Sequence, residues 1–303
     1  MITIENLTKQ FDTITAIDRI SLRIPDSIIF GLLGTNGAGK STLLKLLAGI
    51  LAPEQGKILI DGEPVYENPS CKEQCFYLSD EPYYFPNATA EDMALFYRKQ
   101  YPSLEPEAVR YLAGQLELDI TRPLRTFSKG MKRQIFLIMA LCSNTAYLFC
   151  DEIFDGLDPV VTEAMKHLFH SEMRTRPLTI IVAAHKLQDL EGFCDEIGIL
   201  YKGGILCAQD MRQASASFHK FQCIFETENK ESLSAYLAER LNIVSYSEDG
   251  YFLSLILQGS PENILPILQA RSPVFCKEVP MSVEELFMAK IKEADYDIKK
   301  ALC

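Results

Sequence analysis

Apolar and polar positions alternate with two different periods along the first two thirds of the chain. Short apolar runs of strand length predict extended segments at 17–24, 28–33, 56–62, 146–150, 178–183 and 196–201. Leucine and isoleucine recur at helical spacing in residues 40–50, and helical patterns follow at 87–124 and 129–143. Strands that alternate with helices in this way indicate an α/β fold, here with a helical insert at about 87–143.

The last third of the chain has a different pattern. A small polar stretch at 211–217 predicts a linker between a first domain, 1–210, and a second, 218–303. Beyond it we expect strands at 219–226, 242–247, 251–257 and 274–278, and helices at 230–240 and 261–270. This βαββαβ order indicates a small α+β domain of the ferredoxin-like type. A final helix is predicted from Met281, because Ser282 and Glu285 have the spacing of a capping box.

Composition and charge exclude several classes of protein. The 303 residues carry a formal net charge of −11, which argues against binding to a nucleic-acid backbone as the main role. No apolar run approaches the roughly 20 residues that cross a bilayer, and the N-terminus does not resemble a secretory signal. We therefore expect a cytoplasmic protein. Nine cysteines are scattered without a zinc-binding pattern.

The most informative segment of the chain is a glycine-rich loop that directly follows the apolar run 28–33. Its residues are Gly34, Thr35, Asn36, Gly37, Ala38, Gly39, Lys40, Ser41 and Thr42. Strand, loop and helix start are in the order of a phosphate-binding loop, whose backbone N–H groups and helix N-terminus converge on phosphate oxygens. Lys40 is expected to reach the β- and γ-phosphates, and the Ser41 hydroxyl to ligate Mg²⁺. The loop predicts that the chain binds a nucleoside triphosphate.

Two acids end the apolar run 146–150. Asp151 is expected at the carboxyl end of a strand beside the phosphate loop, where its carboxylate can hold Mg²⁺ directly or through water. Glu152 follows at once and is placed to polarise an attacking water as a general base. Together with the loop, the pair indicates nucleotide hydrolysis as well as binding.

With these segments in place, residues 1 to about 210 resemble the ATP-binding cassette of an ABC transporter. The resemblance rests on a variant signature sequence (Phe127-Ser-Lys-Gly-Met-Lys-Arg-Gln134), a D-loop (Ile153-Phe-Asp-Gly-Leu-Asp-Pro159) and a switch strand ending on a histidine (Thr179-Ile-Ile-Val-Ala-Ala-His185). It implies an α/β P-loop NTPase fold that uses ATP and Mg²⁺. It also implies a head-to-tail homodimer in which each ATP lies between two cassettes.

The resemblance assigns further roles to single residues. Ser128 and Gly130 would face the γ-phosphate held by the second cassette, and His185 would contact the γ-phosphate in its own site. Asp158 would help to order the opposing site, and Phe11 would stack on adenine. Without the resemblance, His185 and Phe11 would be taken for an ordinary strand-end histidine and a core aromatic.

The chain departs from the family pattern in two motifs. Lys129 and Met131 replace a glycine and the glutamine of the signature. Asp80, in a segment that resembles the Q-loop, stands where the family has a glutamine. An acid there can still ligate Mg²⁺, but it adds negative charge beside the phosphates. We expect slower basal turnover or a stronger Mg²⁺ requirement.

The resemblance also implies a separate integral membrane permease, with the cassette bound peripherally to the inner face of the cell membrane. The aromatic run Tyr83-Tyr84-Phe85 could contact the permease, or it could pack on the helical insert. The signature variant and the segment 279–287 are similar to those of single-cassette bacterial exporters of drugs and antimicrobial peptides. Two alternatives stay open: a soluble ABC ATPase that acts without a permease, and an ATP-binding regulator that does not hydrolyse ATP.

Overall fold

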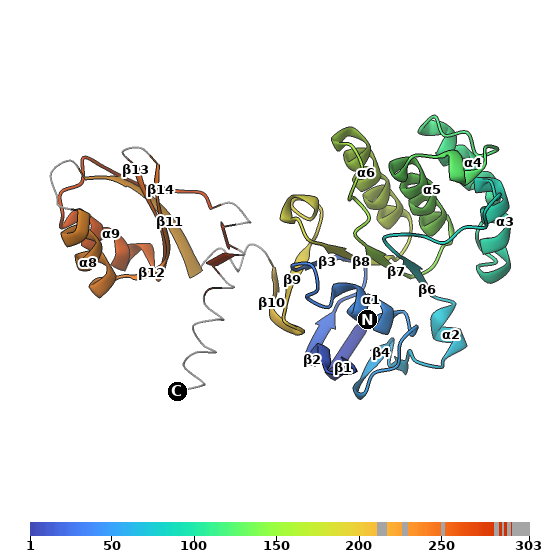
Figure 1. The fold of residues 1–303 in the computed structure, drawn as a ribbon, viewed down its shortest axis with the longest axis horizontal. Helices are drawn as coiled ribbons and strands as arrows, with labels where there is room; N and C mark the ends of the chain where they lie inside the picture. Colours follow the sequence, from blue (N-terminus) through green and yellow to red (C-terminus); the bar gives the residue numbers. More distant parts are fainter. Residues whose placement is uncertain are drawn as a thin grey trace. The chain divides into compact units, whose positions relative to one another are not determined.

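The chain forms two compact units, Met1–Ala208 and Gln209–Cys303 (Figure 1). The computed structural model describes residues 1–210, 217–225, 230–249 and 252–281, together with residues 285, 286, 288, 289 and 292. The linker predicted at 211–217 therefore lies outside the described residues except for Ser217.

An antiparallel sheet of four strands opens the first unit. Its order is β2-β1-β4-β5, formed by β1 (Ile2–Phe11), β2 (Ile14–Ile24), β4 (Gln55–Ile60) and β5 (Glu63–Pro64). The pairing of β1 with β2 shifts register between Ile4 and Leu7, so that buried residues do not alternate regularly along β1. This irregularity explains why the apolar pattern did not predict β1.

A six-stranded sheet forms the centre of the first unit. Its order is β10-β9-β3-β8-β7-β6, with β3 (Ile29–Leu33), β6 (Cys75–Leu78), β7 (Tyr147–Asp151), β8 (Thr179–Ala184), β9 (Glu196–Tyr201) and β10 (Gly204–Asp210). Neighbours from β9 to β6 pair in parallel, so their carboxyl ends lie at one edge. β3, β7 and β8 are fully buried, which confirms the continuous apolar runs as inner strands.

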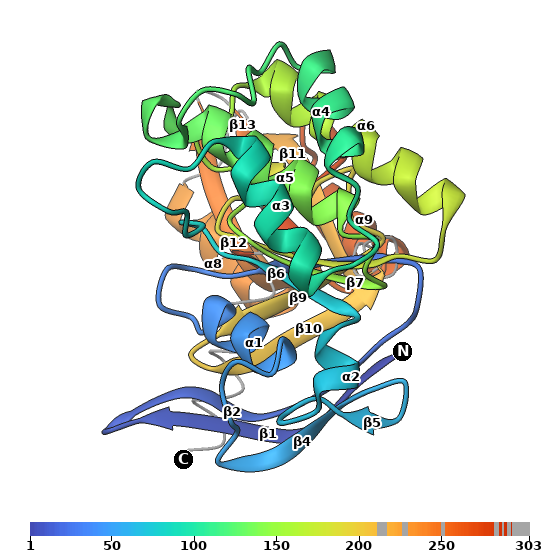
Figure 2. The same cartoon turned by 90° about the vertical axis from the view of Figure 1, so that its right-hand side faces the viewer.

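Helix α1 (Lys40–Leu47) lies between the two sheets (Figure 2). Its leucines, among them Leu43 and Leu47, share one hydrophobic cluster with Ile4 of β1 and Phe149 of β7. This packing fixes the start of the helix, and with it the glycine-rich loop, at the carboxyl edge of the central sheet. A short helix α2 (Pro69–Lys72) precedes β6.

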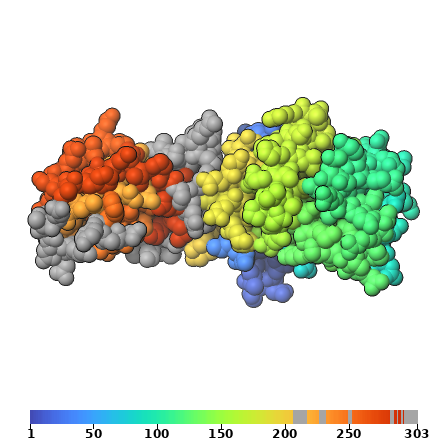
Figure 3. Space-filling view, turned by 90° about the horizontal axis from the view of Figure 1, so that it is seen from above, coloured from blue at the N-terminus to red at the C-terminus, as the bar shows by residue number. Residues whose placement is uncertain are grey.

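Four longer helices complete the first unit and form much of its surface when it is seen from above (Figure 3). They are α3 (Ala90–Gln100), α4 (Pro106–Gln115), α5 (Lys129–Cys142) and α6 (Pro159–Thr175), with 3-10 turns η1 (Leu124–Thr126) and η2 (Leu187–Asp189). Three of these helices fall within the predicted helical insert. Residues Arg133 to Cys142 of α5 are all buried, because this helix packs against α3, α4 and α6.

The second unit has the predicted βαββαβ order. Its elements are β11 (Phe218–Ile224), α8 (Lys230–Arg240), β12 (Asn242–Asp249), β13 (Phe252–Gln258), α9 (Pro261–Gln269) and β14 (Phe275–Val279). The antiparallel sheet order β12-β13-β11-β14 is that of the ferredoxin-like fold. Lys220 pairs with Glu285 at 2.6 Å, and Leu286 packs against Phe218, so Glu285 and Leu286 lie against the sheet. Most of the predicted final helix lies outside the described residues.

Candidate functional site: a nucleotide pocket at the edge of the central sheet

A cavity of about 650 Å³ opens where the glycine-rich loop meets the carboxyl edge of the central sheet. Many of the predicted site residues line it, namely Asn36, Gly37, Gly39, Lys40, Ser41, Thr42, Asp80, Glu152 and His185. They come from the start of α1 and from the loops that follow β3, β6, β7 and β8, which the parallel pairing brings to one edge. The cavity is therefore built where open parallel sheets bind ligands.

The loop needs glycine at two positions, because a side chain at either one would collide with the backbone of a neighbouring strand. Gly39 caps α1 with a left-handed backbone (φ 106°), and a Cβ there would meet the Ala16 carbonyl oxygen at 2.4 Å. A Cβ on Gly34 would meet the Leu200 carbonyl oxygen at 2.6 Å. Any side chain at these positions would push the loop off the flanking strands and change the direction of its N–H groups.

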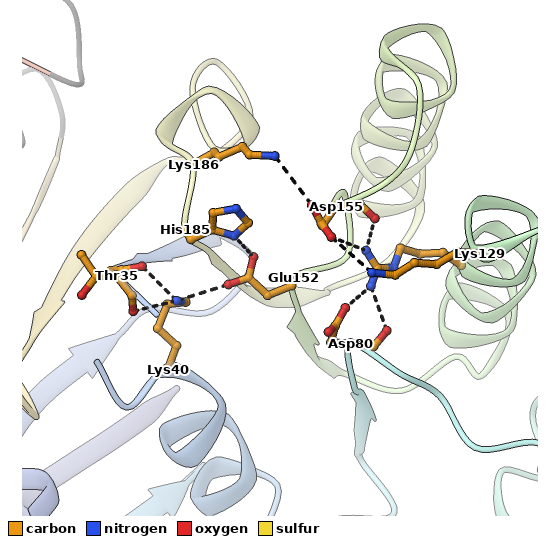
Figure 4. Close-up of polar contacts among 10 residues, drawn as sticks. Thr35, Lys40, Asp80, Lys129, Glu152, Asp155, His185 and Lys186 are labelled. Carbon is orange, nitrogen blue, oxygen red and sulfur yellow. Dashed lines mark hydrogen bonds and ion pairs between the residues drawn. The ribbon is translucent and has the colours of Figure 1, made fainter. Parts of the chain in front are cut away.

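Lys40 is buried at the start of α1, and its ammonium group is held entirely by groups of the site. Its Nζ donates to the Gly34 carbonyl at 2.9 Å and the Thr35 carbonyl at 3.2 Å, and it pairs with Glu152 Oε1 at 3.2 Å. These partners keep the positive charge at the loop, where a phosphate would replace part of them (Figure 4).

Glu152 lies between Lys40 and His185. Its Oε2 is 2.6 Å from His185 Nδ1 while its Oε1 faces Lys40, so both carboxylate oxygens are engaged (Figure 4). The backbone of Glu152 is left-handed (φ 50°), a conformation that costs energy for a residue with a side chain. The Glu152 N–H donates to the Ala183 carbonyl at 3.0 Å, which helps to hold the turn.

Asp151 has the properties of a ligand for a divalent cation. It is buried at the end of β7, and its Oδ1 finds no hydrogen-bond partner among the described residues. Burial raises the pKa of Asp151, and the nearby Glu152 carboxylate acts in the same direction, although a hydrogen bond from Ser41 opposes them. A buried, orphaned carboxylate oxygen beside the Ser41 hydroxyl fits Mg²⁺, which prefers oxygen ligands.

Asp80 lines the cavity, but its carboxylate faces a cation that the sequence did not suggest. Arg133 of α5 donates through Nη2 to the Asp80 carbonyl at 2.8 Å and also to Asp80 Oδ1. The extra negative charge expected at this position is therefore offset by a guanidinium group. The predicted contact of Asp80 with Mg²⁺ stays a prediction.

The signature segment lies at the N-terminus of α5. Ser128 caps the helix by accepting from the Met131 N–H at 3.1 Å, as its position predicts. Gly130 packs closely on the D-loop, since a Cβ there would lie 3.2 Å from the Gly156 carbonyl oxygen. Asp158 caps α6 through the Val161 N–H at 3.0 Å. Its role in an opposing site stays a prediction.

Three parts of the cavity lining were not predicted from the sequence: the segment 14–16, Lys202 with Gly203, and Asp155. Ile14, Lys202 and Gly203 line the cavity, whereas Phe11 is not among the described residues that do so. Phe11 pairs with Ile14 across the β1–β2 turn, is 44% exposed, and lies under Lys9 at 5.2 Å. Its stacking on adenine stays a prediction. The hairpin turn after Phe11 was the one sequence signal that could have suggested Ile14.

Asp155 is the third of these parts, and it pairs with one cation at the start of α5 and another after β8. Its carboxylate lies 3.3 Å from Lys129 and 3.6 Å from Lys186 (Figure 4). Partial burial raises the pKa of Asp155, but Lys129, Lys186 and Arg133 outweigh it and lower that pKa overall. Asp155 lies within the D-loop segment, but its partners are distant in sequence, so the motif did not indicate these contacts.

Fold and site together define a P-loop nucleotide-binding cassette. A profile of the ABC transporter family matches residues 17–155. The ATP-binding protein YtrB of Bacillus subtilis is 29% identical over 96% of this chain and 98% of its own length. The linearmycin resistance ATP-binding protein LnrL of Bacillus subtilis is 30% identical over 68% of each chain, and the bacitracin transport ATP-binding protein BcrA of Bacillus licheniformis is 30% identical over 66% of this chain and 67% of its own.

Solved structures agree on the fold. The ATP-binding subunit of an ABC transporter has a TM-score of 0.64 at 24% identity, covering 71% of this chain and 91% of that one. A dimeric cassette with bound ADP and Pi, in a post-hydrolysis state, also has a TM-score of 0.64, at 19% identity over 70% of this chain and 99% of that one. The chain belongs to the ATP-binding subunits of ABC transporters, a family of ATPases. Among the described residues, no helix is long and apolar enough to cross a membrane.

Proposed function

We propose that the protein hydrolyses Mg²⁺-ATP to power a separate membrane permease, acting as a cassette homodimer at the inner face of the cell membrane. The observation that carries this proposal is the position of Glu152 between Lys40 and His185 at the phosphate loop. A carboxylate held there can accept a proton from water attacking the γ-phosphate. A regulator that only binds ATP would not need this arrangement.

Each residue of the pocket has a separate task in this reaction. Lys40 and the N–H groups of residues 34–42 bind the phosphates, and His185 contacts the γ-phosphate and responds to its loss. Ser41 and Asp151 are the proposed ligands of Mg²⁺, which would neutralise charge that develops on the phosphate oxygens. Phe11 and Ile14 are the candidates for contact with adenine.

The dimer is proposed because Ser128 and Gly130 are not among the described residues that line the cavity of their own subunit. Ser128 stands at the exposed N-terminus of α5, where a helix attracts anions. In a head-to-tail dimer this end would meet the γ-phosphate held by the partner. Hydrolysis would remove the contacts that favour the closed dimer, and reopening would drive the permease.

A second groove, of about 470 Å³, is the proposed contact with the permease. It is lined by Tyr83 and Tyr84, with Lys132 5.0 Å from the centre of the Tyr84 ring. Phe85 packs on Phe96 of α3 with ring centres 5.1 Å apart. The two interpretations of residues 83–85, contact with the permease and packing on the helical insert, therefore apply to different residues. Phe85 packs on the insert, and Tyr83, whose ring packs edge-on against Phe85 at 5.6 Å, is still 69% exposed and offers aromatic surface to a partner.

The names of the relatives guide the choice of cargo. The similar proteins BcrA and LnrL are named for bacitracin transport and linearmycin resistance, and a 28% identical protein of Streptococcus pyogenes, SrtF, for lantibiotic transport. We therefore propose export of a drug, an antimicrobial peptide or another amphiphilic molecule.

Steady-state ATP hydrolysis tests the proposal, measured on the purified chain alone and with the membrane protein that co-purifies with it. We expect stimulation by that protein and loss of turnover in Glu152→Gln. Tyr83→Ala should weaken co-purification, whereas Tyr111→Ala, which removes another exposed tyrosine, is the matched control. Full activity without any membrane partner would favour a soluble ABC ATPase, and no hydrolysis in any state would favour a regulator.

A further inference from the structure

Arg133 is a nearly buried cation that links two loops of the nucleotide pocket. It is 2% exposed, and its guanidinium contacts both the carboxylate and the carbonyl of Asp80. On its other side it donates to the Asp155 carbonyl and lies 4.0 Å from the Asp155 carboxylate. A buried guanidinium is stable only when its charge and its donors are matched in this way.

Asp80 places one end of this link at two pockets of the first unit. It lines the nucleotide cavity, and it also lines the groove formed by Tyr83 and Tyr84. Its side chain is 46% exposed, whereas that of Arg133 is only 3% exposed. Asp80 could therefore turn toward water or a cation without much desolvation, but Arg133 could not follow it.

This asymmetry decides between Arg133 and Mg²⁺ as the partner of Asp80. If Asp80 moved to a metal, Arg133 would lose its closest carboxylate while remaining buried. Removing one partner of a buried ion pair destabilises the fold, because the other charge is left uncompensated. The other candidate ligand, Asp151, has an orphaned Oδ1 and loses nothing by binding a cation. The energetics favour a metal on Asp151 and the guanidinium on Asp80.

We propose that Arg133 holds Asp80 out of the Mg²⁺ coordination sphere, so that Asp80 joins the segment after β6 to α5 instead of binding the metal. This inference rests on the Mg²⁺-ATP function proposed above. It replaces the expectation that Asp80 ligates Mg²⁺, and it makes Arg133 a positioning residue for the pocket. Removing Arg133 would release Asp80 toward the phosphates and the metal.

A double-mutant cycle on nucleotide affinity tests the proposal without using turnover. The dissociation constant of adenylyl imidodiphosphate is measured calorimetrically with Mg²⁺ and with EDTA, and the ratio of the two constants is compared among four proteins. These are the wild type, Asp80→Asn, Arg133→Gln and the double variant. Effects that simply add cancel in such a cycle, so the coupling reports how far the effect of Asp80 depends on Arg133.

We expect Asp80→Asn to change the ratio less than about threefold when Arg133 is present, but by about tenfold or more in the Arg133→Gln background, where the free carboxylate can meet the metal. An equal effect in both backgrounds would overturn the proposal. If Arg133→Gln does not fold, Arg133→Lys takes its place, because one ammonium group cannot reach both Asp80 and Asp155. Absence of nucleotide binding in the wild type would instead refute the proposed function.

Discussion

The substitution Glu152→Gln separates the two roles proposed for Glu152, one in the reaction and one in the pocket without nucleotide. Glutamine has the same shape but cannot accept a proton, so we expect kcat to fall about 10²–10⁴-fold. It also removes the negative partner of Lys40 and His185. The nucleotide-free protein should therefore become less stable.

The size of the stability effect can be worked out from the burial of the pair. The Lys40 side chain is 5% exposed and that of Glu152 16%, so this contact is weakly screened by water. A hydrogen bond to a charged group contributes about 1.5–3 kcal/mol. Relief of repulsion with Asp151 offsets part of the loss, and Lys40 keeps its two carbonyl partners. A net loss of about 1–2 kcal/mol lowers Tm by about 2–8 °C in a domain of this size.

Thermal unfolding with and without Mg²⁺-ATP is the assay. In the proposed mechanism phosphate takes the place of Glu152 beside Lys40, so we expect ATP to raise Tm more in Glu152→Gln than in the wild type. Glu191→Gln changes an exposed acid near the switch strand and serves as the matched control. Wild-type turnover, or an unchanged Tm without nucleotide, would refute the two roles assigned to Glu152.

Three further predictions follow from other residues of the site. Ser128→Ala should cost about 1 kcal/mol of stability through loss of the helix cap, and it should no longer dimerise with ATP. Ser128→Asp should keep the cap but still fail to dimerise, because its charge repels phosphate. Sedimentation measures the dimer, and a dimer of Ser128→Asp would argue against phosphate contact. The pKa of Asp151 is raised in the fold, so the folded state favours the neutral form of this side chain. The contribution of Asp151 to folding stability is therefore present in acid and is lost as pH rises through that pKa. Asp151→Asn should thus raise Tm at pH 7 but not in acid while abolishing Mg²⁺-dependent binding, and a lower Tm at pH 7 would contradict this. Phe11→Ala should weaken ATP binding about tenfold if the ring stacks on adenine; a larger loss in Ile14→Ala would move that role to Ile14.

The phosphate-binding loop and the acid pair were predictable because their chemistry needs neighbouring residues of fixed type. Lys40 and Ser41 follow the glycines directly, and Asp151 with Glu152 directly follows a buried strand. The parallel sheet then brings these two segments to one edge, as the strand order requires. A local motif and a known topology were sufficient here.

Contacts between distant segments could not be predicted in the same way. Arg133 and Asp80 are 53 positions apart, and the pattern of α5 shows Arg133 only as one of several cations near its start. Strand β1 was missed because its bulge, with Asn6 in a left-handed conformation, interrupts the alternation of buried residues. In both cases tertiary packing decides the outcome, and no local pattern records it.

The packing of Leu286 and Ala289 on the sheet of the second unit limits where the protein can be shortened. Leu286 and Ala289 cover Phe218 and Ile256, and the Lys220–Glu285 ion pair fastens this cover at 2.6 Å. A protein ending near Met281 would expose an apolar patch on a sheet face, and we would expect it to aggregate or to bind membranes non-specifically. A purification tag should therefore be added after the residues that cover the sheet and should not replace them.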